Sequence, residues 1–175
     1  MSIRRRPIWR IHLDVELIRL LLLLALTSFS NVGMAQLSDT GPRPDMTPEQ
    51  VVQYQVAALQ HNDDPGTDAG IERAFRFASP SNRQVTGPLA NFIRILKSPV
   101  YAPLLDNRSS VIVGSEVKES QAKILMNVVA ANGRQVTYVF LLSKQGEGEF
   151  NNCWMTDGVA PLQEGEDGSD QGVTI

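Results

Sequence analysis

A change of hydrophobic period near residue 109 constrains the fold of this 175-residue chain more than any other feature. Before it, apolar residues recur at helical spacing in three segments, which indicates three amphipathic helices. After it, β-rich runs follow one another, at 111–117, 122–131, 134–142 and 150–159. Three helices packed on a four-stranded antiparallel meander predict an α+β fold with one folded domain at 47–160.

Local signals mark where the predicted helices begin and end. Thr47-Pro48-Glu49-Gln50 reads as a capping box with proline at the first helical position. The second helix, which contains Ile71 to Ala78, is expected to end at Ser79-Pro80, so that Ser81-Asn82-Arg83 falls in a loop. Gly87-Pro88 opens the third helix.

Asn132-Gly133 is a strong signal for a two-residue hairpin turn. Such a turn pairs Ala131 with Arg134, sets Asn127 opposite Tyr138, and leaves both faces of the hairpin largely apolar. The helices can cover one face. The other is expected to meet a second subunit or a ligand, unless the sheet curls over the helices. A weak homodimer through the open face is therefore predicted.

The first 35 residues have the anatomy of an export signal. An arginine cluster at 4–6 and Arg10 lie ahead of the apolar run 20–26, and Gly33 and Ala35 occupy the −3 and −1 positions of a cleavage site before Gln36. The run is shorter than the ~20 residues that span a bilayer. We expect a cleaved signal peptide and a periplasmic or secreted domain, or a thylakoid-lumen one in a photosynthetic host. The alternative is that the signal is retained as an anchor. That segment is the only part of the chain expected to contact a membrane.

Charge and composition describe the rest of the chain. With five arginines and two acids in residues 1–35, the other 140 residues carry 11 basic and 17 acidic side chains, a net charge of −6. An acidic domain with scattered basic residues argues against nucleic-acid binding. Residues 36–46 read as a flexible linker and 161–175 as a disordered acidic tail.

Several strings resemble a known family. They are FASPSNR at 77–83, TGPL at 86–89 and CWMTDGV at 153–159, together with LQHND at 59–63. These strings are similar to those of an exported bacterial and plastid-related family known only as a domain of unknown function, and the resemblance covers 47–160. It implies no activity. The order of elements also resembles the cone-shaped folds of nuclear transport factor 2 and ketosteroid isomerase, which host enzymes and binding modules alike; a cystatin-like arrangement is another possibility for the same elements.

No catalytic, cofactor or metal site is predicted. Asp63, Asp64 and Asp68 lack the ligand spacing of a calcium loop, and turn chemistry explains them. His61 is the only histidine after the leader, at a helix end that suits a cation. Cys153 is the only cysteine, so no intramolecular disulfide forms, and it is expected to be a small buried residue in a strand.

Five residues are candidates for ligand contacts: Arg83, Asn127, Tyr138, Trp154 and Asp157. Arg83 can grip a carboxylate or tie its loop to free helix carbonyls. Asn127 and Tyr138 form the one polar pair on an apolar face.

Three functions fit these features. The first is an exported, non-catalytic binding or interaction module with a pocket for a small apolar ligand. The second is an isomerase or dehydratase of the cone-fold type that uses Asp157, Tyr138 or Arg83. The third is a structural subunit of an envelope or luminal complex.

Overall fold

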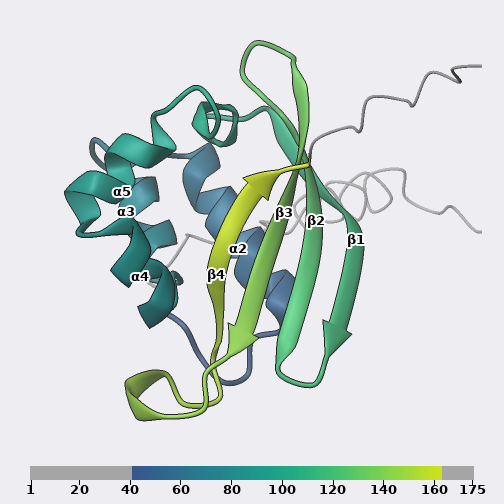
Figure 1. Ribbon diagram of the computed structural model, residues 1–175. Helices are drawn as coiled ribbons and strands as arrows, with labels where there is room; N and C mark the ends of the chain where they lie inside the picture. The colour runs from purple at the N-terminus through teal and green to yellow at the C-terminus, as the bar shows by residue number, and fades with distance from the viewer. Residues whose placement is uncertain (1–40, 163–175) are drawn as a thin grey trace, which may run out of the picture. The chain divides into compact units, whose positions relative to one another are not determined.

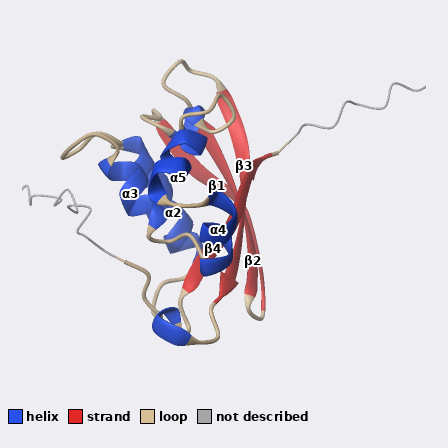
Figure 2. Ribbon diagram, turned by 60° about the vertical axis from the view of Figure 1, so that its left-hand side comes forward, coloured by secondary structure: helices blue, strands red, loops and turns tan. Residues whose placement is uncertain are grey.

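The computed structural model describes residues 41–162, in which α-helices lie on one face of a four-stranded antiparallel sheet (Figures 1 and 2). The predicted α+β class is confirmed, and the strands follow one another in the order β1-β2-β3-β4. The predicted signal peptide and the tail beyond residue 162 lie outside the described residues. Within 41–162, no helix is both long and apolar enough to cross a membrane.

The bounds of the main elements follow the chain. The helices are α2 (Pro48–Gln60), α3 (Ala69–Phe75), α4 (Pro80–Thr86) and α5 (Leu89–Leu96). The strands are β1 (Ser109–Lys118), β2 (Gln121–Val129), β3 (Gln135–Lys144) and β4 (Trp154–Pro161). Short 3-10 turns at Ala102–Leu104 and Gly148–Phe150 precede β1 and β4.

Helix α2 begins as its sequence predicts. The Thr47 side chain accepts a hydrogen bond from the Gln50 amide, and the Gln50 side chain accepts one from the Thr47 amide, which completes the capping box. The helix then buries one face, including Val52 and Val56, against the sheet. Met46, which precedes the capping residue, is also buried.

The predicted end of the second helix is wrong. It breaks after Phe75, and a separate helix, α4, starts at Pro80, so the described chain has four α-helices where three were predicted. Ser79 caps α4 by accepting from the Asn82 amide. Proline is tolerated in the first turn of a helix, where its missing N–H is not needed. Pro80 therefore starts a helix instead of ending one, and Ser81-Asn82-Arg83 is helical.

The hairpin register also differs from the prediction by one residue. The β2–β3 turn has three residues, Ala131 to Gly133, and Ala130 instead of Ala131 is bonded to Arg134. Gly133 has a φ of +88°, while Asn132 has no positive φ. A two-residue type I′ turn needs positive φ at both positions, so the chain forms a three-residue loop with glycine in the left-handed region.

The corrected register sorts the side chains of β2 and β3 onto two different faces. Ile124, Met126 and Tyr138 lie on the helix-covered face and are buried. Leu125 and Val139 share the opposite face with polar Asn127 and Thr137, and Leu141 there is 51% exposed. The prediction of two largely apolar faces is therefore wrong: one face is apolar and the other is mixed.

Strand β4 is an edge strand that is partly covered. The segment between α3 and α4 pairs with it in parallel, because the Thr156 amide donates to Phe77 and the Ser79 amide donates to the Thr156 carbonyl. A bulge lies where the register slips between Leu141 and Leu142, which makes Asp157 the extra residue. This arrangement sets α4 and β4 side by side.

Candidate functional site

A cavity lies between the helices and the sheet, and we call it the helix–sheet cavity. It has a volume of about 210 Å³ and is bounded by α2, α4, α5 and the inner side of β4. Its apolar wall is formed mainly by Leu59, Phe92, Ile95, Leu96, Leu104, Phe140 and Val159. The helical spacing of the apolar residues in α5 turns Phe92, Ile95 and Leu96 toward the same side, which is the side that lines the cavity.

Three buried polar residues form one side of this cavity. Thr156 Oγ1 donates to Gln55 Oε1 at 2.7 Å, and Gln55 Nε2 donates to the Ala74 carbonyl at 3.0 Å. Asn82 Nδ2 donates to the Thr156 carbonyl at 3.0 Å. These bonds tie α2, α3, α4 and β4 together, and they hold polar atoms against an otherwise apolar space.

Two further hydroxyl groups border the cavity. Thr86 Oγ1 donates to the Asn82 carbonyl, and Tyr101 OH donates to the Val159 carbonyl, each at 2.9 Å. Each hydroxyl carries a single hydrogen, so each oxygen keeps only acceptor capacity. The wall is therefore richer in acceptors than in donors.

Asp157 is the only charged residue that the described part of the chain contributes to the cavity wall. The β4 bulge places it at the sheet edge, where it is half-buried and receives a long contact of 3.5 Å from Ser81 Oγ. It makes no ion pair with any residue of 41–162. A carboxylate thus stands at the border of an apolar space.

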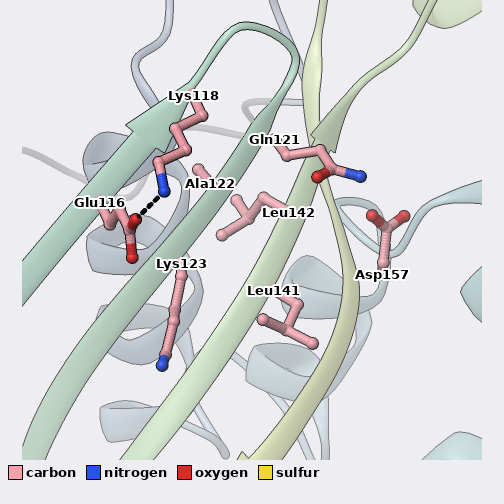
Figure 3. A pocket seen from close by; sticks show the side chains of 8 residues that line it. All are labelled: Glu116, Lys118, Gln121, Ala122, Lys123, Leu141, Leu142 and Asp157. Carbon is pink, nitrogen blue, oxygen red and sulfur yellow. Dashed lines mark ion pairs between the residues drawn. The ribbon is translucent and has the colours of Figure 1, made fainter.

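Asp157 also borders a second hollow, the outer recess, which has a volume of about 410 Å³ (Figure 3). Lys118, Lys123 and Leu141 extend over the face of the sheet that the helices leave open, and Lys118 pairs with Glu116. The Lys118 and Glu116 side chains are exposed, so water screens their ion pair. The outer recess is more open and less apolar than the helix–sheet cavity.

Arg83 does not line the cavity. Its Nη2 atom donates to the carbonyls of Phe75 and Arg76, at 3.3 and 2.8 Å, at the end of α3. Its guanidinium carbon lies 5.1 Å from the ring centre of Phe75 and 5.6 Å from that of Phe150. The structure thus places Arg83 as a tie between α3, α4 and the loop before β4.

The predicted Asn127–Tyr138 pair does not form. Asn127 pairs with Thr137 on the open face and donates to its hydroxyl at 3.1 Å. Tyr138 is fully buried on the helix-covered face and donates to the Val100 carbonyl at 2.7 Å. Burial raises the pKa of Tyr138 to about 12, so the phenol stays protonated at neutral pH.

The remaining candidates lie around β4. Trp154 begins the strand and is buried in the core without lining the cavity. Cys153 lies one residue before the strand, and burial raises the pKa of its thiol. Of the five predicted ligand contacts, only Asp157 borders the helix–sheet cavity.

The acidic turn after α2 is held by side-chain hydrogen bonds. Asn62 Nδ2 donates to Asp63 and Asp68, and Lys97 Nζ lies 2.8 Å from the other Asp68 oxygen. His61 is exposed at the end of α2. Within residues 41–162, no group of three or more His, Cys, Asp or Glu side chains is placed to hold a metal ion.

Sequence reasoning missed Gln55, Asn82 and Thr156 as cavity residues. Gln55 had one available signal, since it stands between apolar residues on the buried side of α2. Asn82 had none, because its helix was not predicted. Thr156 is 101 residues from its partner Gln55, and only the tertiary fold brings the two together.

The fold and the cavity together define a class: an α+β domain whose helices cover one face of a meander and enclose a small, acceptor-rich apolar space. Residues 43–167 match the family described as Domain of unknown function (DUF4864). Because this match covers more than half of the chain, the protein belongs to that family, as the resemblance of its strings predicted. No curated protein and no solved structure gives a match. The likeness to cone-shaped folds stays a prediction.

Proposed function

We propose that this domain is a non-catalytic binding module that holds a small, mainly apolar ligand in the helix–sheet cavity. The observation that carries the proposal is a partly open space of about 210 Å³ lined mainly by apolar side chains, with the buried Gln55, Asn82 and Thr156 on one side. Ligand pockets in proteins share this pattern of an apolar lining with a few placed polar groups.

The size of the cavity limits the ligand. A dry apolar cavity of roughly 150 Å³ is sufficient for benzene. Pockets for drug-sized molecules begin at roughly 300 Å³. A volume of about 210 Å³ therefore suits one ring or a short chain with a small polar group.

The arrangement of ionisable groups favours binding over catalysis. An isomerase or dehydratase needs an acid and a base that converge on the same substrate. Asp157 borders the cavity, but Tyr138 and Arg83 do not, and both are engaged with backbone carbonyls. The enzyme alternative would therefore have Asp157 acting without either partner.

We also propose that the domain acts after export, on the support of the arginine-rich and apolar leader. N-terminal sequencing of the protein from its own cells tests this, with Gln36 as the expected first residue. An intact Met1 in the cytosolic fraction would contradict it.

Native mass spectrometry of the purified full chain tests the binding proposal. We expect a retained molecule that is released on denaturation. Val159→Phe, which enlarges a side chain of the cavity wall, should abolish retention. The matched control is Val139→Phe on the open face of the neighbouring strand, and it should leave retention unchanged. Equal retention by both variants would contradict the proposed site. If the wild type neither retains a molecule nor binds an added ligand, the proposed function is contradicted.

A further inference from the structure

We infer that the ligand of the helix–sheet cavity is a small cationic amphiphile: a protonated amine attached to a ring or a short hydrocarbon body. This inference rests on the proposed function and adds the chemical class of the ligand. It depends on the charge and the hydrogen-bonding capacity of the cavity wall.

The charge of the wall has one sign. Among the described residues, Asp157 is the only charged one that borders the cavity, and no lysine or arginine of 41–162 does so. Within residues 41–162, Asp157 makes no ion pair. The outer recess has two lysines: Lys118 is paired with Glu116, and Lys123 makes no ion pair with Asp157. A ligand with positive charge would therefore supply a counter-ion that residues 41–162 do not supply.

The hydrogen bonds of the wall point to the same class. The hydroxyls of Thr86, Thr156 and Tyr101 each donate their hydrogen bond to an acceptor of the protein. Their oxygens can then only accept. Among the side chains of the described wall, the donors that remain are the second amide hydrogens of Gln55 and Asn82, which are neutral and few. An ammonium group, with donors and no acceptor, matches this wall, whereas a carboxylate does not.

The aromatic residues of the wall add a further attraction. Phe92, Tyr101 and Phe140 border the same space as Asp157. Aromatic faces attract ammonium groups, most strongly where water is excluded. The rings also contact the apolar body of the ligand, so a single molecule can satisfy both parts of the cavity.

Three probes of nearly equal size test the inference on the full chain by isothermal titration calorimetry at pH 7: benzylamine, benzyl alcohol and benzoate. We expect benzylamine to bind at least about tenfold more tightly than benzyl alcohol, because charge-assisted hydrogen bonds are the stronger ones. Benzoate should bind least, because it carries the same sign of charge as Asp157. Asp157→Asn should lower the affinity for benzylamine to that of benzyl alcohol. Affinity for benzyl alcohol should not change, which also reports that the variant is folded.

The matched control is Glu116→Gln, which removes a carboxylate of the outer recess alone, and it should change none of the affinities. Equal binding of the three probes, or a preference for benzoate, overturns the cationic class and leaves the binding function standing. If none of the probes binds, both the inference and the proposed cavity function fail. If Glu116→Gln weakens benzylamine as much as Asp157→Asn, the amine lies in the outer recess and the inference is overturned.

Discussion

The Thr156 hydroxyl on β4 donates a 2.7 Å hydrogen bond to the Gln55 side chain on α2, and both residues are buried beside the helix–sheet cavity. The bond joins the first described helix to the last strand. It also fixes Gln55 so that its amide reaches the Ala74 carbonyl on α3. One side-chain pair thus holds three elements around the cavity.

Thr156→Val should destabilise the domain by about 1–3 kcal/mol, because it leaves the buried Gln55 oxygen without a donor. Chemical denaturation measures the change in the free energy of unfolding. In a double-mutant cycle with Gln55→Leu, the two losses should not add, since either change breaks the same bond. Strict additivity would contradict the coupling.

Gly70→Ala should be among the most damaging single changes. A β-carbon at Gly70 would lie 2.1 Å from the Ala58 carbonyl oxygen and 2.7 Å from the Asn62 Cα. Both atoms belong to the backbone and cannot move aside, so we expect a loss at or above the upper end of the ~1–3 kcal/mol typical of overpacking. Gly66→Ala, where nothing lies within 4 Å, is the control and should change stability by less than about 0.5 kcal/mol. Similar thermal melts for the two variants would contradict the close packing of α2 on α3.

The Asp68–Lys97 pair should make stability depend on acid pH. The hydrogen bond from Lys97, with a further contribution from Asn62, holds the pKa of Asp68 below its ordinary value. The stabilisation is therefore complete above the unfolded pKa of about 3.9 and is lost as the pH falls through the lower folded pKa.

Denaturation of wild type and Asp68→Asn between pH 7 and pH 2 measures this effect. The stability advantage of the wild type should shrink below about pH 4. Glu72→Gln, on the exposed side of α3, is the control. A constant difference across the whole range would show that the Asp68 carboxylate is not stabilised by folding.

The homodimer stays a prediction, and the structure shows which residues should be used to test it. Leu125, Val139 and Leu141 lie on the open face, whereas Met126 lies in the core. Burial of this apolar surface against a second copy remains the physical reason to expect self-association. Leu141→Lys should shift sedimentation equilibrium of the full chain toward monomer, and Val100→Lys, exposed in a turn, should not. A wild type that is strictly monomeric at high concentration would contradict the prediction.

Sequence patterns predicted the class of the fold because they are local. The capping box at Thr47 and the spacing of Leu89, Phe92, Ile93 and Leu96 depend only on neighbours along the chain. The errors arose where a local pattern allows two geometries. Pro80 can end one helix or start another, and Asn132-Gly133 can form a turn of two residues or part of a turn of three.

The candidate site was harder to predict than the fold. The observed register differs from the predicted one by one residue, so Asn127 and Tyr138 lie on opposite faces and the predicted polar pair does not form. The polar residues that do meet, Gln55 and Thr156, come from distant parts of the chain. Asp157 alone was predicted and borders the cavity, because its position within β4 did not depend on the hairpin register.

The measurement that tests the account most directly is a methyl NMR titration of the full chain with benzylamine. We predict that the methyl signals of Ile95, Leu96 and Val159, which line the helix–sheet cavity, shift with one saturable dissociation constant. The methyl signals of Leu125 and Val139, on the open face of the sheet, should not move. Shifts confined to Leu125 and Val139, or no saturable shift at any of the five residues, would contradict the account.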